Sequence, residues 1–152
     1  MKNACDPIVK KELLDRIGGL DPAAKARWGK MNVNEAVCHL TDQLRDISGE
    51  RPVQYRRNLF IRYAVYPLLS VLPAWPRGRF PAAPEYDQEK DGTKASTFEN
   101  DRRMLLEMLR RLDLHDPALK LPLHPAFGKL SRAQYGRIVY QHFHHHLTQF
   151  GA

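Results

Sequence analysis

The sequence predicts an all-α protein: a four-helix bundle with short extra helices and a long proline-rich arm. Helix-start patterns open four segments, and in two of them apolar residues follow at helical spacing. Strand signals are weak, because the chain has no Asn-Gly turn between alternating runs and no regular series of short β-branched segments. A length of 152 residues suits one domain, so we expect residues 1–152 to form a single helical bundle.

The first helix is expected over Pro7–Ile17. Asp6 and Pro7 form an N-cap followed by proline at the first helical position, where proline is well tolerated. The glycine pair at 18–19 ends the helix, since glycine is favoured just beyond helix C-termini. Asp21 and Pro22 repeat the opening pattern and predict a short turn.

The second main helix should start near Val33 and end at Gly49. Asn32 and Glu35 have the spacing of a capping box, in which each side chain bonds the backbone N–H of the other residue. Its apolar stripe consists of Val33, Val37, Leu40, Leu44 and Ile47. The opposite face is expected to be solvated and carries Glu35, Asp42 and Asp46. The flank between the two faces carries His39 and Gln43.

Residues 59–72 are apolar on all sides of a helix, so we expect this segment to be covered on most sides. Packing in the core together with a homodimer contact is favoured over a contact with a membrane surface. The segment is too short to be a transmembrane segment, which needs about 20 residues. An irregular arm with four prolines follows over residues 73–95. Ordinary packing explains four nearby aromatic residues more simply than the mouth of a pocket does: Tyr55, Tyr63, Tyr66 and Trp75.

Two further long helices are expected in the C-terminal third. Residues 96–99 have capping-box spacing and open a helix to about Leu112, and residues 131–134 open the last helix, which runs nearly to Phe150. Residues 113–130 form an irregular connection. Two histidines in this connection are expected to be solvated: His115 and His124.

Four histidines lie in the last predicted helix, at positions 142, 144, 145 and 146. At about 100° per residue, His142, His146 and Gln149 fall on the apolar stripe, His145 lies at its edge and His144 faces away. Buried polar groups without partners cost about 1–3 kcal/mol each, so this stripe needs partners. A hydrogen-bonded core network would supply them. A divalent metal would do so as well, because histidines four residues apart converge on one point.

His39 is the best candidate for a third metal ligand. Its flank position suits a residue that reaches into a bundle cavity, and it suits an ordinary boundary histidine equally well. Cys38 lies about 100° away around the same helix, so we expect a buried structural thiol there instead of a ligand.

Three parts of the chain resemble the DinB-like (YfiT-type) superfamily of metal-binding four-helix bundles, and more narrowly an uncharacterised branch known only as a domain of unknown function. These parts are residues 28–42, 124–130 and 140–151. The superfamily has one histidine on the second main helix and a pair four residues apart on the last, which here are His39, His142 and His146. The resemblance implies a site for a divalent metal ion, zinc or nickel, and some members transfer low-molecular-weight thiols.

The favoured function is a metal-dependent enzyme, a hydrolase or thiol transferase acting on a small-molecule substrate. Three histidine ligands leave a coordination position open, and a bound metal lowers the pKa of a water or thiol towards neutrality. His145 and Gln149 are expected to contact a ligand histidine or the substrate. No general base is predicted, because Asp42 projects from the face expected to be solvated. The alternative is a non-catalytic binding or structural module with a metal-stabilised or vestigial site.

The charge of the chain is concentrated in one segment. The formal net charge is +7, and residues 51–80 hold six arginines and no acid, whereas the rest has 18 basic and 17 acidic residues. If this segment borders the metal site, an anionic small substrate or an anionic surface is favoured. The six arginines are Arg51, Arg56, Arg57, Arg62, Arg77 and Arg79.

Nucleic acid is an unlikely partner, because acidic residues are interleaved with the arginines of the helix after residue 96. With only two cysteines there is no disulfide framework, and the first residues lack the apolar region of a signal peptide. We therefore expect a cytoplasmic protein.

Overall fold

The structure, a computed structural model, describes residues 1–56, 58–72, 75–77 and 82–152. It is all-helical, as predicted, and no strand occurs in the part of the chain that it describes. The described residues form the α-helices α1 (Pro7–Gly18), α2 (Val33–Ser48), α3 (Tyr66–Val71), α4 (Phe98–Arg111) and α5 (Arg132–Gln149). A π-helical turn, η1 (Ile61–Val65), leads directly into α3, and a short 3₁₀ helix, η2 (Pro84–Tyr86), lies within the arm.

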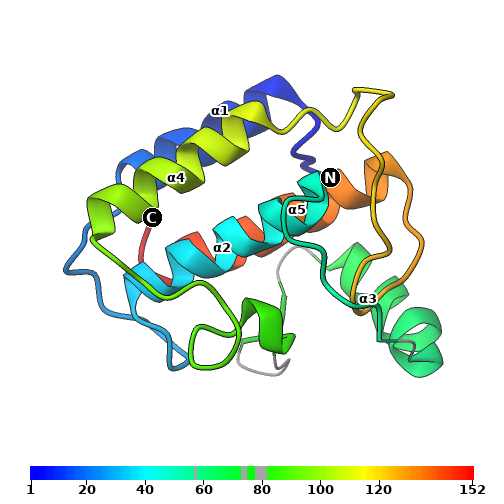
Figure 1. The fold of residues 1–152 in the computed structure, drawn as a ribbon, viewed down its shortest axis with the longest axis horizontal. Helices are drawn as coiled ribbons and strands as arrows, with labels where there is room; N and C mark the ends of the chain where they lie inside the picture. Colours follow the sequence, from blue (N-terminus) through cyan, green and yellow to red (C-terminus); the bar gives the residue numbers. More distant parts are fainter. Residues whose placement is uncertain (57, 73–74, 78–81) are drawn as a thin grey trace.

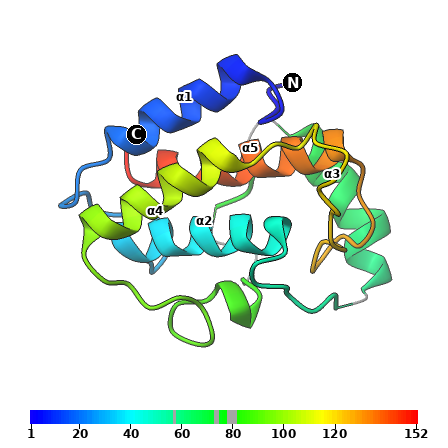
Figure 2. The same ribbon diagram turned by 45° about the horizontal axis from the view of Figure 1, so that its top comes forward.

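Helices α1, α2, α4 and α5 form the bundle, and α3 lies at one end of it (Figures 1 and 2). The apolar stripes of the four helices meet in one core, where burial of each large aliphatic side chain contributes about 1.5–3 kcal/mol. Fully buried members include Leu13, Ile17, Leu40, Leu44, Leu105, Leu109, Val139 and Phe143.

Local capping patterns fix three of the four main helix starts where the sequence predicts them. Asp6 caps α1 through the backbone N–H of Ile8. The capping boxes of α2, with Asn32 and Glu35, and of α5, with Ser131 and Gln134, are both complete. The left-handed backbone of Gly49, with φ +78°, ends α2 and favours glycine there.

The predicted start of α4 is wrong by one residue. Thr97, not Ser96, is the N-cap, and its hydroxyl accepts the backbone N–H of Asn100. The backbone N–H and hydroxyl of Ser96 instead both bond the carboxylate of Asp101, each at 2.7 Å. An aspartate one turn into the helix therefore competes with the expected partner, Glu99.

The face of α2 that was expected to be solvated is covered. Asp42 and Asp46 are each only 1% exposed, because the arm over residues 82–95 passes along this side of α2, opposite α4 (Figures 1 and 2). A proline-rich stretch has no apolar periodicity, so its docking on α2 could not be predicted from the pattern.

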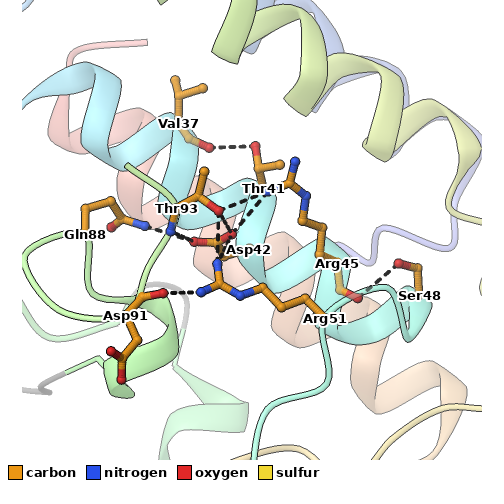
Figure 3. Close-up of polar contacts among 9 residues, drawn as sticks. All are labelled: Val37, Thr41, Asp42, Arg45, Ser48, Arg51, Gln88, Asp91 and Thr93. Atoms are coloured by element: carbon orange, nitrogen blue, oxygen red, sulfur yellow. Dashed lines mark hydrogen bonds and ion pairs between the residues drawn. The ribbon is translucent and has the colours of Figure 1, made fainter. Parts of the chain in front are cut away.

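Asp42 holds the arm through a buried polar network (Figure 3). Its carboxylate accepts the backbone N–H of Thr93 at 2.8 Å, the hydroxyl of Thr93 at 2.5 Å and the side-chain amide of Gln88 at 3.2 Å. Arg51 donates to the same carboxylate at 3.0 Å and also bonds the carbonyl oxygen of Asp91. The network therefore joins α2 to residues 88–93 of the arm.

Within a single chain, the segment over residues 59–72 is covered on one side only, the side that packs in the core. Leu69 is buried, and Ile61, Val65 and Tyr66 pack against the core. The exposed side carries Leu59, Phe60, Tyr63, Leu68 and Val71, which are 51–71% exposed. The homodimer contact stays a prediction, which sedimentation at increasing protein concentration would test. Among the described residues, no helix has the length and apolarity needed to cross a membrane.

Candidate metal centre

Three histidines from two helices meet inside the bundle. His39 of α2 and the pair His142 and His146 of α5 are only 4%, 8% and 9% exposed. The Nε2 atom of His142 lies 2.8 Å from Nε2 of His39 and 3.1 Å from Nε2 of His146. One ligand nitrogen from each residue lies within 4.8 Å of the others, so the cluster could hold a metal ion.

The hydrogen-bond partners of two rings decide which nitrogens carry hydrogen. Nδ1 of His39 lies 2.6 Å from the carbonyl oxygen of Tyr86, which can only accept, so this Nδ1 is the donor. Nδ1 of His146 lies 2.8 Å from Oε1 of Gln149, whose Nε2 donates to the carbonyl oxygen of Trp28 at 2.6 Å. In the neutral rings of His39 and His146, Nε2 therefore has a free lone pair.

These two lone pairs both point at Nε2 of His142, which carries at most one hydrogen. That hydrogen can satisfy one of the two nitrogens well, whereas a cation among them would satisfy all three. The separations of 2.8 and 3.1 Å are slightly shorter than the roughly 3.3 Å expected between ligands of a tetrahedral zinc with Zn–N of about 2.0–2.1 Å. The three imidazoles thus fit a divalent metal after small rotations of their rings.

Burial keeps the cluster neutral. Removal from water lowers the pKa of His39 and places the pKa values of His142 and His146 well below the ordinary value, with the neighbouring histidines adding to the effect at His142 and His146. Neutral imidazole is the form that binds a metal, so no proton has to leave these rings near neutral pH.

The arm orients His39. Tyr86, whose carbonyl oxygen accepts from His39, is itself buried, and its hydroxyl donates to the carboxylate of Asp46 at 2.7 Å. The other carboxylate oxygen of Asp46 accepts the backbone N–H of Val53 at 2.8 Å. Burial raises the pKa of Asp46, while these two hydrogen bonds act in the opposite direction. A chain of contacts therefore runs from α2 through the arm and back to His39. Sequence reasoning missed Tyr86, since its role depends on a backbone oxygen.

Contacts of His145 and Gln149 link the cluster to the loop before α2. Gln149 accepts from His146, as described above, and Nε1 of Trp28 donates to Nε2 of His145 at 3.3 Å. The ring of His145 also meets that of His146 edge-on at 5.1 Å. His145 and Gln149 thus each contact His146, and each is also hydrogen-bonded to Trp28.

Of the four aromatic residues near the segment 59–72, Trp75 lies at the cluster. Its ring stacks on that of His142 at 5.3 Å between centroids, and its Nε1 donates to Gln141 at 3.3 Å. Tyr66 packs on Phe127 instead, at 4.9 Å. No periodic pattern predicts this contact, because Trp75 lies in the irregular arm.

Most of the described arginines of the basic segment do not lie at the cluster. Arg51 belongs to the network around Asp42, and Arg56 forms an ion pair with Glu85 at 2.9 Å. Arg62 donates to backbone carbonyl oxygens of the connection between α4 and α5. Two arginines lie outside the described residues: Arg57 and Arg79.

Arg77 is the arginine of this segment that approaches the cluster. Its guanidinium carbon lies 4.5 Å from the centre of the Trp28 ring, whose Nε1 donates to His145. Among its described arginines, the basic segment therefore borders the candidate site through Arg77.

The two histidines of the connection between α4 and α5 differ in exposure. His115 is exposed, as predicted, but His124 is not a solvated loop residue. Its Nδ1 accepts the backbone N–H groups of Ala126 and Phe127, and its ring stacks on Phe127 at 4.4 Å, which closes a tight turn. Cys38 is buried, as predicted, and burial raises the pKa of its thiol to about 12.

A comparison with protein families matches residues 78–152 to a family described as "Protein of unknown function (DUF1569)". The matched half includes His142, His146, His145 and Gln149, and it leaves His39 outside. The predicted resemblance to a family of unknown function is therefore confirmed for the C-terminal half. Kinship with the DinB-like superfamily stays a prediction. No curated protein and no solved structure gave a significant match.

Proposed function

We propose that the protein binds a divalent metal ion, zinc or nickel, through His39, His142 and His146 and uses it in catalysis on a small molecule. The observation that carries this proposal is the convergence of three Nε2 atoms, two of which have free lone pairs fixed by their partners. Neutral imidazole suits both metals. A bound metal with three protein ligands would lower the pKa of a water or thiol in its remaining position.

The residues around the cluster have the roles that such a site needs. The carbonyl oxygen of Tyr86 accepts a hydrogen bond from Nδ1 of His39, and Oε1 of Gln149 accepts one from Nδ1 of His146. Each hydrogen bond orients its ligand ring and raises the basicity of that ring. Trp75 covers His142 and excludes water from that side. Transfer of a thiol or hydrolysis of an electrophilic small molecule would rely on the metal to lower the pKa of the attacking thiol or water, because among the described residues no carboxylate hydrogen-bonds a cluster histidine.

The second candidate is a non-catalytic module in which the metal only stabilises the bundle. The burial of the three ligands favours this candidate. The three histidines are only 4–9% exposed, so a substrate has little access to them in this conformation. Metal-linked stability without turnover of esters or thiol acceptors would support this candidate over the enzyme.

Metal should stabilise the folded protein. With free zinc or nickel at 100 times the dissociation constant, stability should rise by about 2.7 kcal/mol, which is roughly 5–10 °C in Tm for a chain of this size. Thermal unfolding with excess metal, compared with unfolding after chelator treatment, measures the shift, and elemental analysis gives the stoichiometry. One metal per chain is expected, and an unchanged Tm with no bound metal would reject the proposal.

Gln149→Leu should weaken zinc binding by about 10–100-fold without removing a ligand, because the Nδ1 hydrogen of His146 loses its acceptor. Competition with a chromogenic chelator measures the affinity. The exposed Gln54→Leu is the matched control and should leave the affinity unchanged. Equal affinities of the two variants would show that Gln149 does not orient the ligand ring.

A further inference from the structure

Near the histidine cluster lies a cationic group whose N–H donors none of the described residues accepts. Arg77 is exposed, and among the described residues none accepts a hydrogen bond from its guanidinium or forms an ion pair with it. The other described arginines of the basic segment are bonded elsewhere in the chain, as shown above.

The Trp28 ring holds this guanidinium in a cation–π contact, with the guanidinium carbon 4.5 Å from the ring centre. This contact occupies none of the guanidinium N–H groups with an acceptor among the described residues, and a planar guanidinium suits two parallel hydrogen bonds to a carboxylate or phosphate. A lysine could not present such a fork.

Trp28 is fixed relative to the cluster at two points. Its Nε1 donates to His145, and its carbonyl oxygen accepts from Gln149, which in turn bonds His146. The stacked guanidinium is therefore tied to the cluster through short, directional contacts.

We propose that Arg77, stacked on Trp28, is the subsite for a carboxylate or phosphate group of a small molecule whose reacting part lies at the histidine cluster. The substrate class is thus a small oxyanion-bearing molecule. The reaction at the cluster rests on the proposed function, whereas binding of the oxyanion by Arg77 does not require a metal.

The test uses inorganic phosphate as the probe and chelator-treated protein, so that a metal cannot bind the phosphate. Titration calorimetry at constant ionic strength gives the affinity. Intrinsic fluorescence locates the site, because the two tryptophans of the chain lie close to it: Trp28 contacts His145, and Trp75 stacks on His142. Saturable binding with a change in fluorescence is expected for the wild-type protein.

Arg77→Gln should weaken phosphate binding at least tenfold, because charge-assisted hydrogen bonds are lost. Arg77→Lys should give an intermediate affinity. Arg56→Gln removes an equal charge from the same basic segment, away from the tryptophans, and should leave the affinity unchanged. The absence of saturable binding, or equal binding by wild type and Arg77→Gln, would overturn the subsite.

Metal analysis of the same proteins separates this inference from the proposed function. Arg77→Gln should keep the metal content of the wild type, since Arg77 touches none of the three cluster histidines. If no protein binds metal but phosphate binding still depends on Arg77, the metal proposal fails and the subsite stands.

Discussion

Replacing Asp42 by alanine is expected to lower the free energy of unfolding by about 3–5 kcal/mol. The side chain of Asp42 is fully buried and accepts hydrogen bonds from Thr93, Gln88 and Arg51. Its removal leaves the backbone N–H of Thr93 without its acceptor and the guanidinium of Arg51 without the carboxylate that balances its charge. Urea denaturation in the presence of chelator measures the loss, so that metal binding makes no contribution.

Asp15→Ala is the matched control for this prediction. Asp15 also pairs with a basic side chain, Lys11, but its side chain is 63% exposed, so its loss should change stability by less than about 0.5 kcal/mol. Asp42→Asn, which keeps one acceptor oxygen, should fall between the two. A loss below about 1 kcal/mol for Asp42→Ala would mean that the arm is held on α2 by its other contacts.

The starts of α1, α2 and α5 could be predicted from the sequence because capping is a local property. The side chain and the backbone N–H that it bonds are two or three residues apart, as with Asn32 and Glu35. At α4 the same local pattern failed, since Asp101 also reached Ser96. Local patterns therefore predict a helix start well until a second local partner competes.

The arm shows where periodicity stops being informative. Helical spacing correctly separates the apolar stripe of α2 from Asp42 and Asp46, but it cannot tell a solvated polar face from one covered by a distant irregular segment. Both aspartates bond residues 7 to 51 positions away, in the arm or in the loop that follows α2, and such contacts depend on tertiary structure. The orienting role of Tyr86 was hidden for the same reason.

The histidine cluster was predictable in part, more than the contacts of the arm and less than the helix starts. The spacing of four residues places His142 and His146 on one side of α5, and this was predictable from helix geometry alone. Helix geometry left His39 open, because a flank position is compatible with either a boundary or a core residue. In the structure His39 is buried where α2 packs against α5, and its hydrogen bond to the carbonyl oxygen of Tyr86 orients the ring.

His142→Ala should weaken binding of zinc or nickel at least a hundredfold, because it removes the central ligand of the proposed site. His142 lies between the other two nitrogens at 2.8 and 3.1 Å, so the remaining pair would bind as two separated imidazoles from different helices. Competition titration gives the affinity, and elemental analysis of the purified variant should find no stoichiometric metal. The increase in Tm with added metal should disappear together with it.

His144→Ala is the matched control, since it removes a histidine from the same helix two residues away. His144 faces outwards, where its Nδ1 contacts Arg16 at 3.0 Å and its ring stacks on Tyr140. Its loss should change stability slightly and leave metal affinity unchanged. His39→Ala should match His142→Ala, because the third ligand comes from the other helix. If His39→Ala keeps full affinity while His142→Ala loses it, the metal is held by α5 alone, and the three-histidine site is wrong.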